Sequence, residues 1–424
     1  MDLFDDLLAR GLIQDSTDRD ALRARLAEGP VTVYYGCDPS ADSLHVGNLI
    51  GLVVLRRFQL AGHRPIALAG GATGMIGDPG GKSAERNLLA DAELTANVER
   101  IREQMARLID FDDAEAPALL VDNRDWTAEM SVLEFLRDPG KFVTVQQMTG
   151  KESVRSRLGS EQGLSYTEFS YMLLQANDYA HLAEHEGCEL QIGGADQWGN
   201  ISLGVDLTRR RLGRHVHAFT WPLLTRADGS KYGKTAGGDT MWLGEQRMSP
   251  YAFFQGWMHI DDADVRRLLA QLTFLDLDEV DAVASEHEAE PGRRTGQRRL
   301  AQEVTTLVHG AAAAVAAAEA SAILFGGDPT TASEAALQMV AGEVETTELG
   351  GDDLVSGLPI VDVLVTTGLA GSKGEARRLL DQGGVSLNGG TISAERVVTR
   401  EDGLYGSLVL LRRGKKRWHV LRLR

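Results

Sequence analysis

Short apolar runs that end in glycine alternate with helical patterns over the first 220 or so residues, and this alternation constrains the fold more than any other feature. Three runs are predicted to be strands: VTVYYG (31–36), PIALAGG (65–71) and CELQIGG (188–194). Helices are predicted after the first and the last of them, over 43–62 and roughly 197–212. Strands that alternate with helices favour a parallel sheet covered by helices. The sequence therefore predicts an α/β, Rossmann-like parallel-sheet domain over residues 1–220, with an insertion at about 115–165.

The rest of the 424-residue chain changes character twice. A loop region is predicted at 221–246, and residues 247–325 are almost wholly helical in pattern, which predicts an all-α domain. An acidic stretch bounded by Gly and Pro turns, 326–353, is predicted to be an inter-domain linker. Residues 354–424 combine a helix with several short strands and are predicted to form a small α+β module.

Charge is distributed unevenly along the chain. The net charge is −17, yet residues 354–424 carry 12 Lys+Arg against 6 Asp+Glu. An acidic body with a basic end indicates either a module that binds a polyanion or a solvated basic tail.

Composition gives a simple expectation for the compartment. The sequence has 2 cysteines, Cys37 and Cys188, outside any metal-ligand spacing. It opens on an acidic segment without the features of a secretory signal, and no apolar stretch approaches the ~20 residues that span a bilayer. We expect a cytoplasmic protein without a membrane partner.

The segment YYGCDPSADSLHVGN (34–48) has the layout of a phosphate site. A strand ends at Gly36, a turn follows, and a helix is predicted to start near Ser43, with His45, Gly47 and Asn48 in its first turn. Helix N-termini present unpaired N–H groups and favour phosphate. A strand–helix turn with a capping serine would account for the same residues without any bound nucleotide.

A second segment, TRADGSKYGKT (225–235), offers flexible cations beside glycine. Lys231, Lys234 and Thr235 could stabilise charge that develops on a transferred phosphate. Neither this segment nor GDPGGKS (77–83) is a P-loop, because each has one residue too few between its glycines. HLAEH (181–185) matches a zinc-protease pattern, but two surface histidines explain it better than a metal site does.

The two phosphate segments, in this order and about 185 residues apart, resemble the HIGH and KMSKS motifs of class I aminoacyl-tRNA synthetases. Three further segments narrow the resemblance to the bacterial-type tyrosyl-tRNA synthetases: GGATGMIGDPGGKSAER, SYTEFSYMLLQANDY and LQIGGADQWGNI. The 354–424 module resembles the S4 RNA-binding domain of that family. One departure is Asn48, where the motif usually has its second histidine, and we expect an altered ATP contact there without loss of activity.

The resemblance implies a tyrosine-tRNA ligase that forms tyrosyl-adenylate from L-tyrosine and ATP and then charges tRNA(Tyr). Tyr171, Gln175 and Asp178 fall on one face of a helix predicted over 166–182, as the family's amino-acid pocket requires. The resemblance implies these tyrosine-binding residues: Tyr34, Asp78, Asn123, Tyr171, Gln175, Asp178 and Gln197. Tyr34 and Asp178 would bind the phenolic hydroxyl, a group that the substrate of the related tryptophanyl enzymes lacks.

The resemblance also implies an ATP site, with the Rossmann-like domain as the catalytic domain. The residues expected to contact ATP or the leaving pyrophosphate are Gly36, Asp38, Ser40, His45, Gly47, Asn48, Gly193, Asp196, Lys231, Lys234 and Thr235. Mg²⁺ is expected with ATP, without a dedicated protein cage and without an organic cofactor.

The remaining implications concern tRNA and a second subunit. The 247–325 domain is expected to bind the anticodon region, and the basic module is expected to contact tRNA through these residues: Lys373, Arg377, Arg378, Arg412, Arg413, Lys415, Lys416 and Arg417. A homodimer built through the 115–165 insertion is expected. The alternative of another class is an RNA-binding paralogue that has lost catalysis, and the retained His45, Lys231 and Lys234 favour the enzyme.

Overall fold

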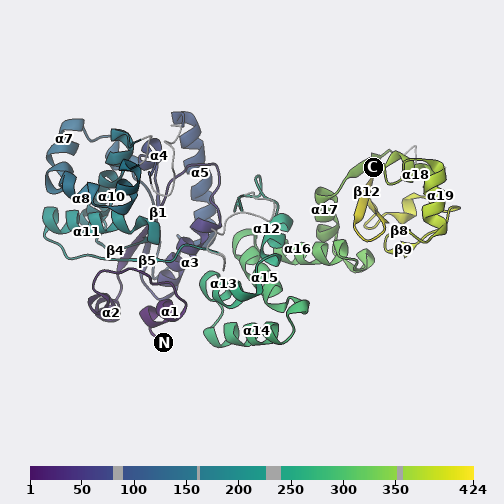
Figure 1. Cartoon of the computed structure of the whole chain (residues 1–424), viewed down its shortest axis with the longest axis horizontal. Helices are drawn as coiled ribbons and strands as arrows, with labels where there is room; N and C mark the ends of the chain where they lie inside the picture. The colour runs from purple at the N-terminus through teal and green to yellow at the C-terminus, as the bar shows by residue number, and fades with distance from the viewer. Residues whose placement is uncertain (80–88, 160–162, 226–239, 351–356) are drawn as a thin grey trace. The chain divides into compact units, whose positions relative to one another are not determined.

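The computed structural model describes residues 1–79, 89–159, 163–225, 240–350 and 357–424, which divide into two compact units (Figure 1). The first unit contains Met1–Met248 and His259–Leu300, and the second contains Ser249–Met258 and Ala301–Arg424. Each unit has its own sheet. The finer functional boundaries drawn from the sequence stay predictions.

A parallel sheet of five strands forms the centre of the first unit, in the order β3-β2-β1-β4-β5. Its strands are β1 (Thr32–Cys37), β2 (Arg64–Ala69), β3 (Leu119–Asp122), β4 (Cys188–Gly194) and β5 (His217–Trp221). The predicted α/β class and the three predicted strands are confirmed. β3 is the edge strand of this sheet and lies inside the range predicted to be an insertion, so the inserted helices begin only after it.

Helices cover both faces of this sheet, as Figure 1 shows. α3 (Val46–Leu60) and α5 (Asp91–Leu108) lie on one side, and α10 (Tyr166–His185) and α11 (Trp198–Leu212) lie on the other. Neighbouring side chains of β1 point to opposite faces. Tyr34 packs with Tyr179 of α10, whereas Tyr35 packs against α3.

The start of α3 differs from the prediction. The helix begins at Val46 with His45 as its N-cap, so His45 precedes the first turn that was predicted from Ser43. Ser43 does not cap the helix, because its hydroxyl donates to the Leu44 carbonyl at 2.8 Å and accepts from the Gly244 N–H at 2.9 Å.

The insertion between β3 and α10 consists of short helices. They are α6 (Arg124–Thr127), α7 (Val132–Arg137), the 3-10 turn η1 (Pro139–Phe142), α8 (Val145–Thr149) and α9 (Glu152–Leu158). A buried ion pair joins this insertion to α10, since Arg157 contacts Glu168 at 2.8 Å and both side chains are at most 5% exposed. The insertion is therefore fixed to the helix that carries Tyr171, Gln175 and Asp178.

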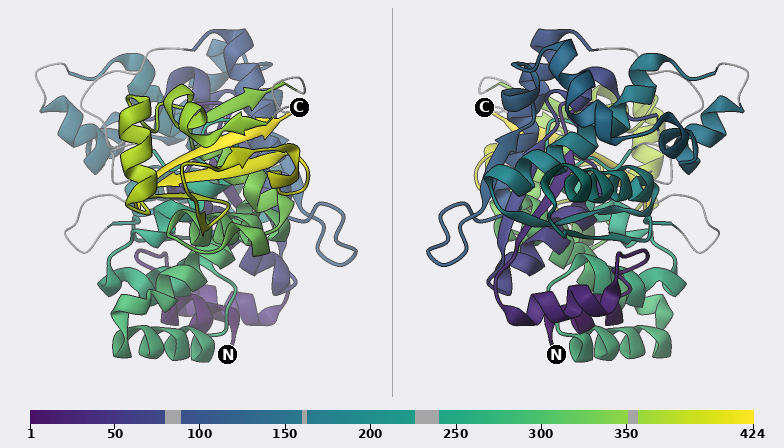
Figure 2. Two further views of the ribbon diagram at one scale, coloured as in Figure 1. Left: turned by 90° about the vertical axis from the view of Figure 1, so that its right-hand side faces the viewer. Right: turned by 90° about the vertical axis from the view of Figure 1, so that its left-hand side faces the viewer.

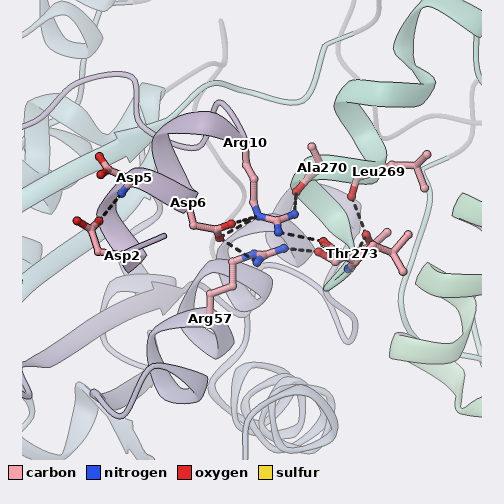
Figure 3. A network of polar contacts seen from close by, with 9 residues as sticks. Asp2, Asp5, Asp6, Arg10, Arg57, Leu269, Ala270 and Thr273 are labelled. Atoms are coloured by element: carbon pink, nitrogen blue, oxygen red, sulfur yellow. Dashed lines mark hydrogen bonds and ion pairs between the residues drawn. The ribbon is translucent and has the colours of Figure 1, made fainter. Parts of the chain in front are cut away.

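A polar network fixes the other end of α3, as Figure 3 shows. Asp6 of α1 (Leu3–Ala9) accepts from Arg10 at 2.9 Å and from Arg57 of α3 at 3.2 Å. Arg10 donates to the Ala270 carbonyl at 3.1 Å, and Arg57 donates to the Thr273 carbonyl. These carbonyls lie at the end of α13 (Val265–Leu272), which the network ties to α3.

Helices and a second sheet form the second unit. The helices are α12 (Pro250–Met258), the larger part of α15 (Thr295–His309), α16 (Ala311–Leu324), α17 (Glu334–Glu343), α18 (Ile360–Thr366) and α19 (Lys373–Asp381); α14 (Leu277–Ala289) belongs to the first unit. The sheet order is β6-β12-β11-β8-β9, with β6 (Thr346–Leu349), β12 (Arg417–Leu423), β11 (Leu408–Arg413), β8 (Val385–Leu387) and β9 (Gly390–Thr391). The left panel of Figure 2 shows these strands in yellow and yellow-green beside the helices. A pair of short strands, β7 (Leu358–Pro359) and β10 (Val397–Val398), completes the unit.

This second sheet has a core on each face. α18 and α19 cover one face, where Leu364 and Leu380 pack with Val409 and Leu421. α16 and α17 cover the other, where Leu337 packs with Leu410 and Val420.

The segment predicted to be a linker, 326–353, is therefore structured where it is described. It contains α17, whose apolar face is buried, and β6, which pairs in parallel with β12. Its Gly, Pro and acidic residues are typical of a connector, but the buried Ala336, Leu337 and Val340 make it part of the core.

Within the described part of the chain, the helices are all too short or too polar to cross a membrane.

Candidate active site

A cavity of about 830 Å³ opens at the carboxyl ends of β1 and β4. The strand order reverses between these two strands, and ligands of open α/β sheets bind at such a point. Most of the predicted site residues line it: Tyr34, Gly36, Asp38, His45, Gly47, Asn48, Asp78, Tyr171, Gln175, Asp178, Gly193, Asp196 and Gln197.

The other predicted residues lie elsewhere. Ser40 is exposed on the turn after β1 and is not part of the cavity lining. Asn123 is fully buried behind the lining residues. Lys231, Lys234 and Thr235 lie outside the described residues.

Tyr34 and Asp178 are buried polar residues of the cavity lining, and each is 2% exposed. The Tyr34 hydroxyl is buried and has no hydrogen-bond partner among the described residues. Burial, followed by the charge of Asp178, raises its pKa well above the usual value. An unpaired buried hydroxyl costs free energy, so this position is suited to a ligand that carries its own polar group.

The carboxylate of Asp178 is oriented by two N–H donors. Asn123 Nδ2 donates to one oxygen and Trp126 Nε1 donates to the other, both at 2.9 Å. Burial raises the pKa of Asp178 to about 7, although these two hydrogen bonds act against the rise. Because a carboxylate has about four acceptor positions, both oxygens retain capacity for a further donor.

A chain of hydrogen bonds connects Asp178 to the end of β1. Asn123 Nδ2 also donates to Thr73 Oγ1 at 2.9 Å, and Thr73 donates to Asp38 Oδ1 at 2.7 Å. The Tyr171 hydroxyl donates to Asp38 Oδ2 at 2.7 Å. Asp38, predicted to contact ATP, thus also holds Tyr171 in place.

A second polar group lines the same cavity through Asp78, Gln175 of α10 and Gln197, and Asn200 of α11 supports it from behind. Gln197 Nε2 donates to Asp78 Oδ2 at 2.6 Å. Asn200 Nδ2 donates to Gln175 Oε1 at 2.9 Å and to Gln197 Oε1 at 3.3 Å. The arrangement gathers acceptor oxygens, including a carboxylate, which suits a small cation such as an ammonium group.

The N-terminal turn of α3 forms another wall. His45 Nδ1 accepts from the Gly47 N–H at 3.0 Å, so the neutral imidazole carries its proton on Nε2. Asn48 Oδ1 accepts from the His45 N–H at 3.1 Å, which completes a capping box. A Cβ on Gly47 would lie 2.7 Å from the His45 ring, so glycine is required for this arrangement.

The residues on both sides of 226–239 belong to the same site. Trp221, Leu223 and Leu224 line the cavity on one side, and Thr240 lines it on the other. Immediately afterwards, Val46 N donates to the Met241 carbonyl at 3.0 Å, and Leu243 N donates to the Leu44 carbonyl at 2.8 Å. The described residues before the second motif segment thus line the cavity, and those after it are hydrogen-bonded to the start of the first motif.

Four residues of the cavity lining or of its hydrogen-bond network were not predicted from the sequence: Thr73, Trp126, Gln191 and Asn200. Gln191 of β4 lines the cavity, and its Oε1 is buried without a partner in the described part of the chain. Trp126 stacks on His181 with ring centroids 4.3 Å apart. The spacing of Asn123 and Trp126, three residues apart after a strand, was the available signal, but the sequence does not show that both reach α10.

The basic residues predicted to contact tRNA gather on two adjoining elements of the second unit. Lys373, Arg377 and Arg378 belong to α19, and the others lie in or beside the β11–β12 hairpin. Arg413 joins the two by an ion pair with Glu375 at 2.9 Å. Arg377, Arg378, Lys415, Lys416 and Arg417 are exposed.

Comparison with known proteins identifies relatives over the whole chain. The family model described as tRNA synthetases class I (W and Y) matches residues 26–326, and that of the Tyrosine--tRNA ligase SYY-like C-terminal domain matches residues 337–421. The Tyrosine--tRNA ligase of Opitutus terrae is 52% identical over 425 residues, covering 100% of both chains. That of Mycobacterium tuberculosis (strain ATCC 25618 / H37Rv) is 50% identical over 419 residues, covering 98% of this chain and 97% of the relative.

A solved structure has the same fold over most of the chain. The C-terminally truncated mitochondrial tyrosyl-tRNA synthetase of Aspergillus nidulans superimposes with a TM-score of 0.69 at 30% identity, covering 76% of this chain and 94% of that one.

Proposed function

The chain belongs to the class I tyrosyl-tRNA synthetases, and from this premise we propose how its cavity performs the reaction of that family. The enzyme activates L-tyrosine with ATP, releases pyrophosphate and transfers the tyrosyl group to the 3′ end of tRNA(Tyr). We propose that tyrosine binds against the Tyr34 side of β1 and ATP against the N-terminal turn of α3.

The observation that carries this assignment is the buried hydroxyl of Tyr34 beside the oriented carboxylate of Asp178. A tyrosine phenol would donate to Asp178 and accept from Tyr34. Phenylalanine would leave the Tyr34 hydroxyl buried and unpaired, which costs roughly 1–3 kcal/mol, and would leave Asp178 without the third donor.

The acceptor group around Asp78 would hold the substrate's ammonium. Asp78 supplies charge, while Tyr171 and Gln175 supply oxygen atoms on the same wall. Gln197 positions Asp78 by its 2.6 Å hydrogen bond, and Asn123 positions Asp178. These two are proposed as positioning residues that act through the neighbouring carboxylates.

The chemical step needs no nucleophile from the protein. An oxygen of the tyrosine carboxylate, already ionised, forms a bond to the α-phosphorus of ATP as the bond to the bridging oxygen of pyrophosphate breaks. Catalysis then consists of positioning and of electrostatic stabilisation of the leaving group. His45, with its proton on Nε2, is suited to donate to a phosphate oxygen.

The remaining ATP contacts stay proposals drawn from the family. Gly36, Asp38, Gly193 and Asp196 would bind adenosine, and all four line the cavity. Ser40, Lys231, Lys234 and Thr235 would act on the pyrophosphate. The anchoring of residues 240–243 beside 44–46 supports a role for the lysine segment at the same phosphates.

Mg²⁺ is proposed to arrive with ATP. Among the described residues no group of three or more His, Cys, Asp or Glu is placed to hold a metal ion. Mg²⁺ usually binds through substrate phosphates, waters and one or two carboxylates, so ATP would supply most of its ligands.

We propose that α19 and the β11–β12 hairpin contact tRNA, because their exposed basic residues face solvent on adjoining elements. Deleting 354–424 would test this poorly, since β12 completes a sheet with β6, which lies before the deletion. Charge reversal of exposed Arg377 and Arg378 is sharper. Aminoacylation should fall while pyrophosphate exchange stays unchanged, and unchanged aminoacylation would remove these residues from the tRNA site.

A homodimer built through the insertion is also proposed. Val132 and Leu133 of α7 are 74% and 71% exposed, and Leu133 lines a second cavity of about 590 Å³ together with Trp126 and Met130. Apolar side chains this exposed suit a two-fold interface between identical surfaces. Leu133→Glu should shift the mass in sedimentation from dimer to monomer, and a wild-type monomer would overturn the proposal.

We place the enzyme in the cytoplasm, where tRNA and ATP are available.

Tyrosine-dependent exchange of pyrophosphate into ATP tests the proposed function directly. Exchange should require tyrosine and be weak with phenylalanine or tryptophan. Stronger exchange with tryptophan would overturn the assignment of the Tyr34–Asp178 pair, and no exchange would favour an RNA-binding protein without catalysis.

A further inference from the structure

The second turn of α3 contains a glycine that intrinsic helix preference does not explain. Gly51 lies inside a buried helix, where glycine is less favourable than alanine by ~1 kcal/mol. A Cβ at this position would lie 2.3 Å from Cζ of Tyr35 and 2.8 Å from Cε2. The ring of Tyr35 therefore occupies the volume that any side chain of residue 51 would need.

Packing holds this ring from the other side as well. Trp221 contacts it edge to face, with ring centroids 5.4 Å apart. Tyr35 is 7% exposed, and both aromatic residues line the cavity. The ring thus forms a fixed spacer between β1 and α3 at the edge of the proposed ATP site.

The hydroxyl of Tyr35 joins a small polar group at the start of the helix. It lies beside the side chains of Cys37 and Asn48, and burial raises its pKa well above the usual value. Cys37 lies two residues along β1, on the same face of the sheet. Asn48 Nδ2 also contacts Cys37 Sγ at 3.8 Å.

Asn48 connects this polar group to His45. Its Oδ1 accepts from the His45 N–H, while its Nδ2 is directed toward Cys37 Sγ. Both ends of the Asn48 amide are therefore used within the protein. Asn48 also lines the cavity, so this role is additional to the ATP contact expected from the sequence.

We propose that Tyr35 is a positioning residue for ATP, which fixes the His45–Gly47 turn through Asn48 and requires glycine at position 51. The proposal rests on the proposed role of that turn in ATP binding. Tyr35 and Gly51 form an interlocked pair, so a substitution at one determines what the other position tolerates.

Three variants test the interlock. Gly51→Ala should reduce kcat/KM for ATP in pyrophosphate exchange by about 100-fold, because a misplacement near 1 Å can cost that much. Tyr35→Phe keeps the ring and removes a polar neighbour of Cys37 and Asn48, which should cost about fivefold. Tyr35→Val with Gly51→Ala makes room for the new methyl group and should recover at least about tenfold over Gly51→Ala alone.

Gly199→Ala is the matched control. This glycine lies in the first turn of α11, and its added Cβ would be 3.5 Å from Lys151, an ordinary contact. It should change kcat/KM for ATP by less than about twofold. Tyrosine affinity, measured by equilibrium binding, should be unchanged in all these variants, and Tm confirms that each protein is folded.

Three results would overturn the proposal. Gly51→Ala could behave like Gly199→Ala, the double variant could lose activity and Tm additively, or tyrosine affinity could fall in parallel with ATP use. His45→Ala, measured in the same assays, separates the role of the His45–Gly47 turn in ATP binding from the interlock of Tyr35 with Gly51. If it leaves ATP use unchanged, the role of the turn fails, while rescue of Tm by the double variant still decides whether the pair is interlocked.

Discussion

Two adjacent tyrosines on β1 serve opposite faces of the same sheet in opposite ways. The Tyr34 hydroxyl faces α10 and has no partner in the described part of the chain, whereas the Tyr35 hydroxyl faces α3 and has Cys37 and Asn48 as polar neighbours. An unsatisfied buried group selects a ligand that satisfies it, and a satisfied one holds the protein in a single shape. The difference indicates that recognition is concentrated on the tyrosine side and preorganisation on the ATP side.

The strongest test of this division is Asp178→Ala. It removes the acceptor for the substrate phenol and leaves the donors of Asn123 and Trp126 unpaired. kcat/KM for tyrosine should fall by about 1,000-fold, equivalent to ~4 kcal/mol, while KM for ATP stays within about twofold. Asp206→Ala, an exposed aspartate on α11, is the control. A matching loss in ATP binding would erase the distinction between the two faces.

The two faces should also differ in pH dependence. The carboxylate of Asp178 is the form that accepts hydrogen bonds, and its pKa is about 7. kcat/KM for tyrosine should therefore fall about tenfold for each pH unit below 7. Burial raises the pKa of Cys37 to about 12, so this thiol should contribute no such titration on the ATP face. A pH profile for ATP that matches the tyrosine profile would contradict this.

The stability of the fold should depend on the protonation of Asp178 in the opposite direction to tyrosine use. Stability should fall as pH rises, whereas kcat/KM for tyrosine should increase. A pKa raised on folding means that the folded state binds the proton more tightly, so the contribution of Asp178 to stability is present below its unfolded pKa of about 3.8 and is lost as pH rises through about 7. Asp178→Asn should remove this loss. Its Tm relative to wild type should increase between pH 5 and pH 8, and a constant difference would show that Asp178 is not the group responsible.

Tyr34→Phe should have a smaller effect that is specific to selectivity. Loss of one hydroxyl contact with substrate should weaken tyrosine use by about tenfold, and it should improve phenylalanine activation relative to tyrosine because one fewer buried group is left unpaired. Exchange assays with both amino acids measure the ratio. Unchanged selectivity would place the hydroxyl outside the amino-acid pocket.

The smallest predicted change comes from Trp126→Phe. The ring stack on His181 is retained, but the N–H donor to Asp178 is lost, so the pKa of Asp178 should rise further. Tyrosine use at pH 7 should fall by about fivefold and recover partly at higher pH. Recovery that is absent at pH 8.5 would mean that Trp126 acts through packing alone.

The sequence predicted those parts of the fold and site that depend on local pattern. Strand–glycine runs located β1, β2 and β4, and helical spacing placed Tyr171, Gln175 and Asp178 on one face of α10. The start of α3 was misplaced because Ser43 is used by Gly244, 201 residues away. The linker prediction for 326–353 failed for a similar reason, since α17 and β6 are stabilised by distant strands and not by their own composition.

Side-chain chemistry was predicted less completely. The pairing of Tyr34 with Asp178 followed from family resemblance, and the structure adds why Asp178 is oriented. The interlock of Tyr35 with Gly51 had no signal in the sequence, because a glycine inside a helix gives no indication of which ring fills the space above it.

The order of strands in the second sheet has a consequence for how the protein is made. β12 lies between β6 and β11, although it follows both in the sequence. During synthesis from the N-terminus, β6 and β11 are completed while their shared neighbour is still missing, and each presents an unpaired edge. The nascent chain is therefore exposed to chaperones, and to mispairing with other chains, until the codons for β12 have been translated.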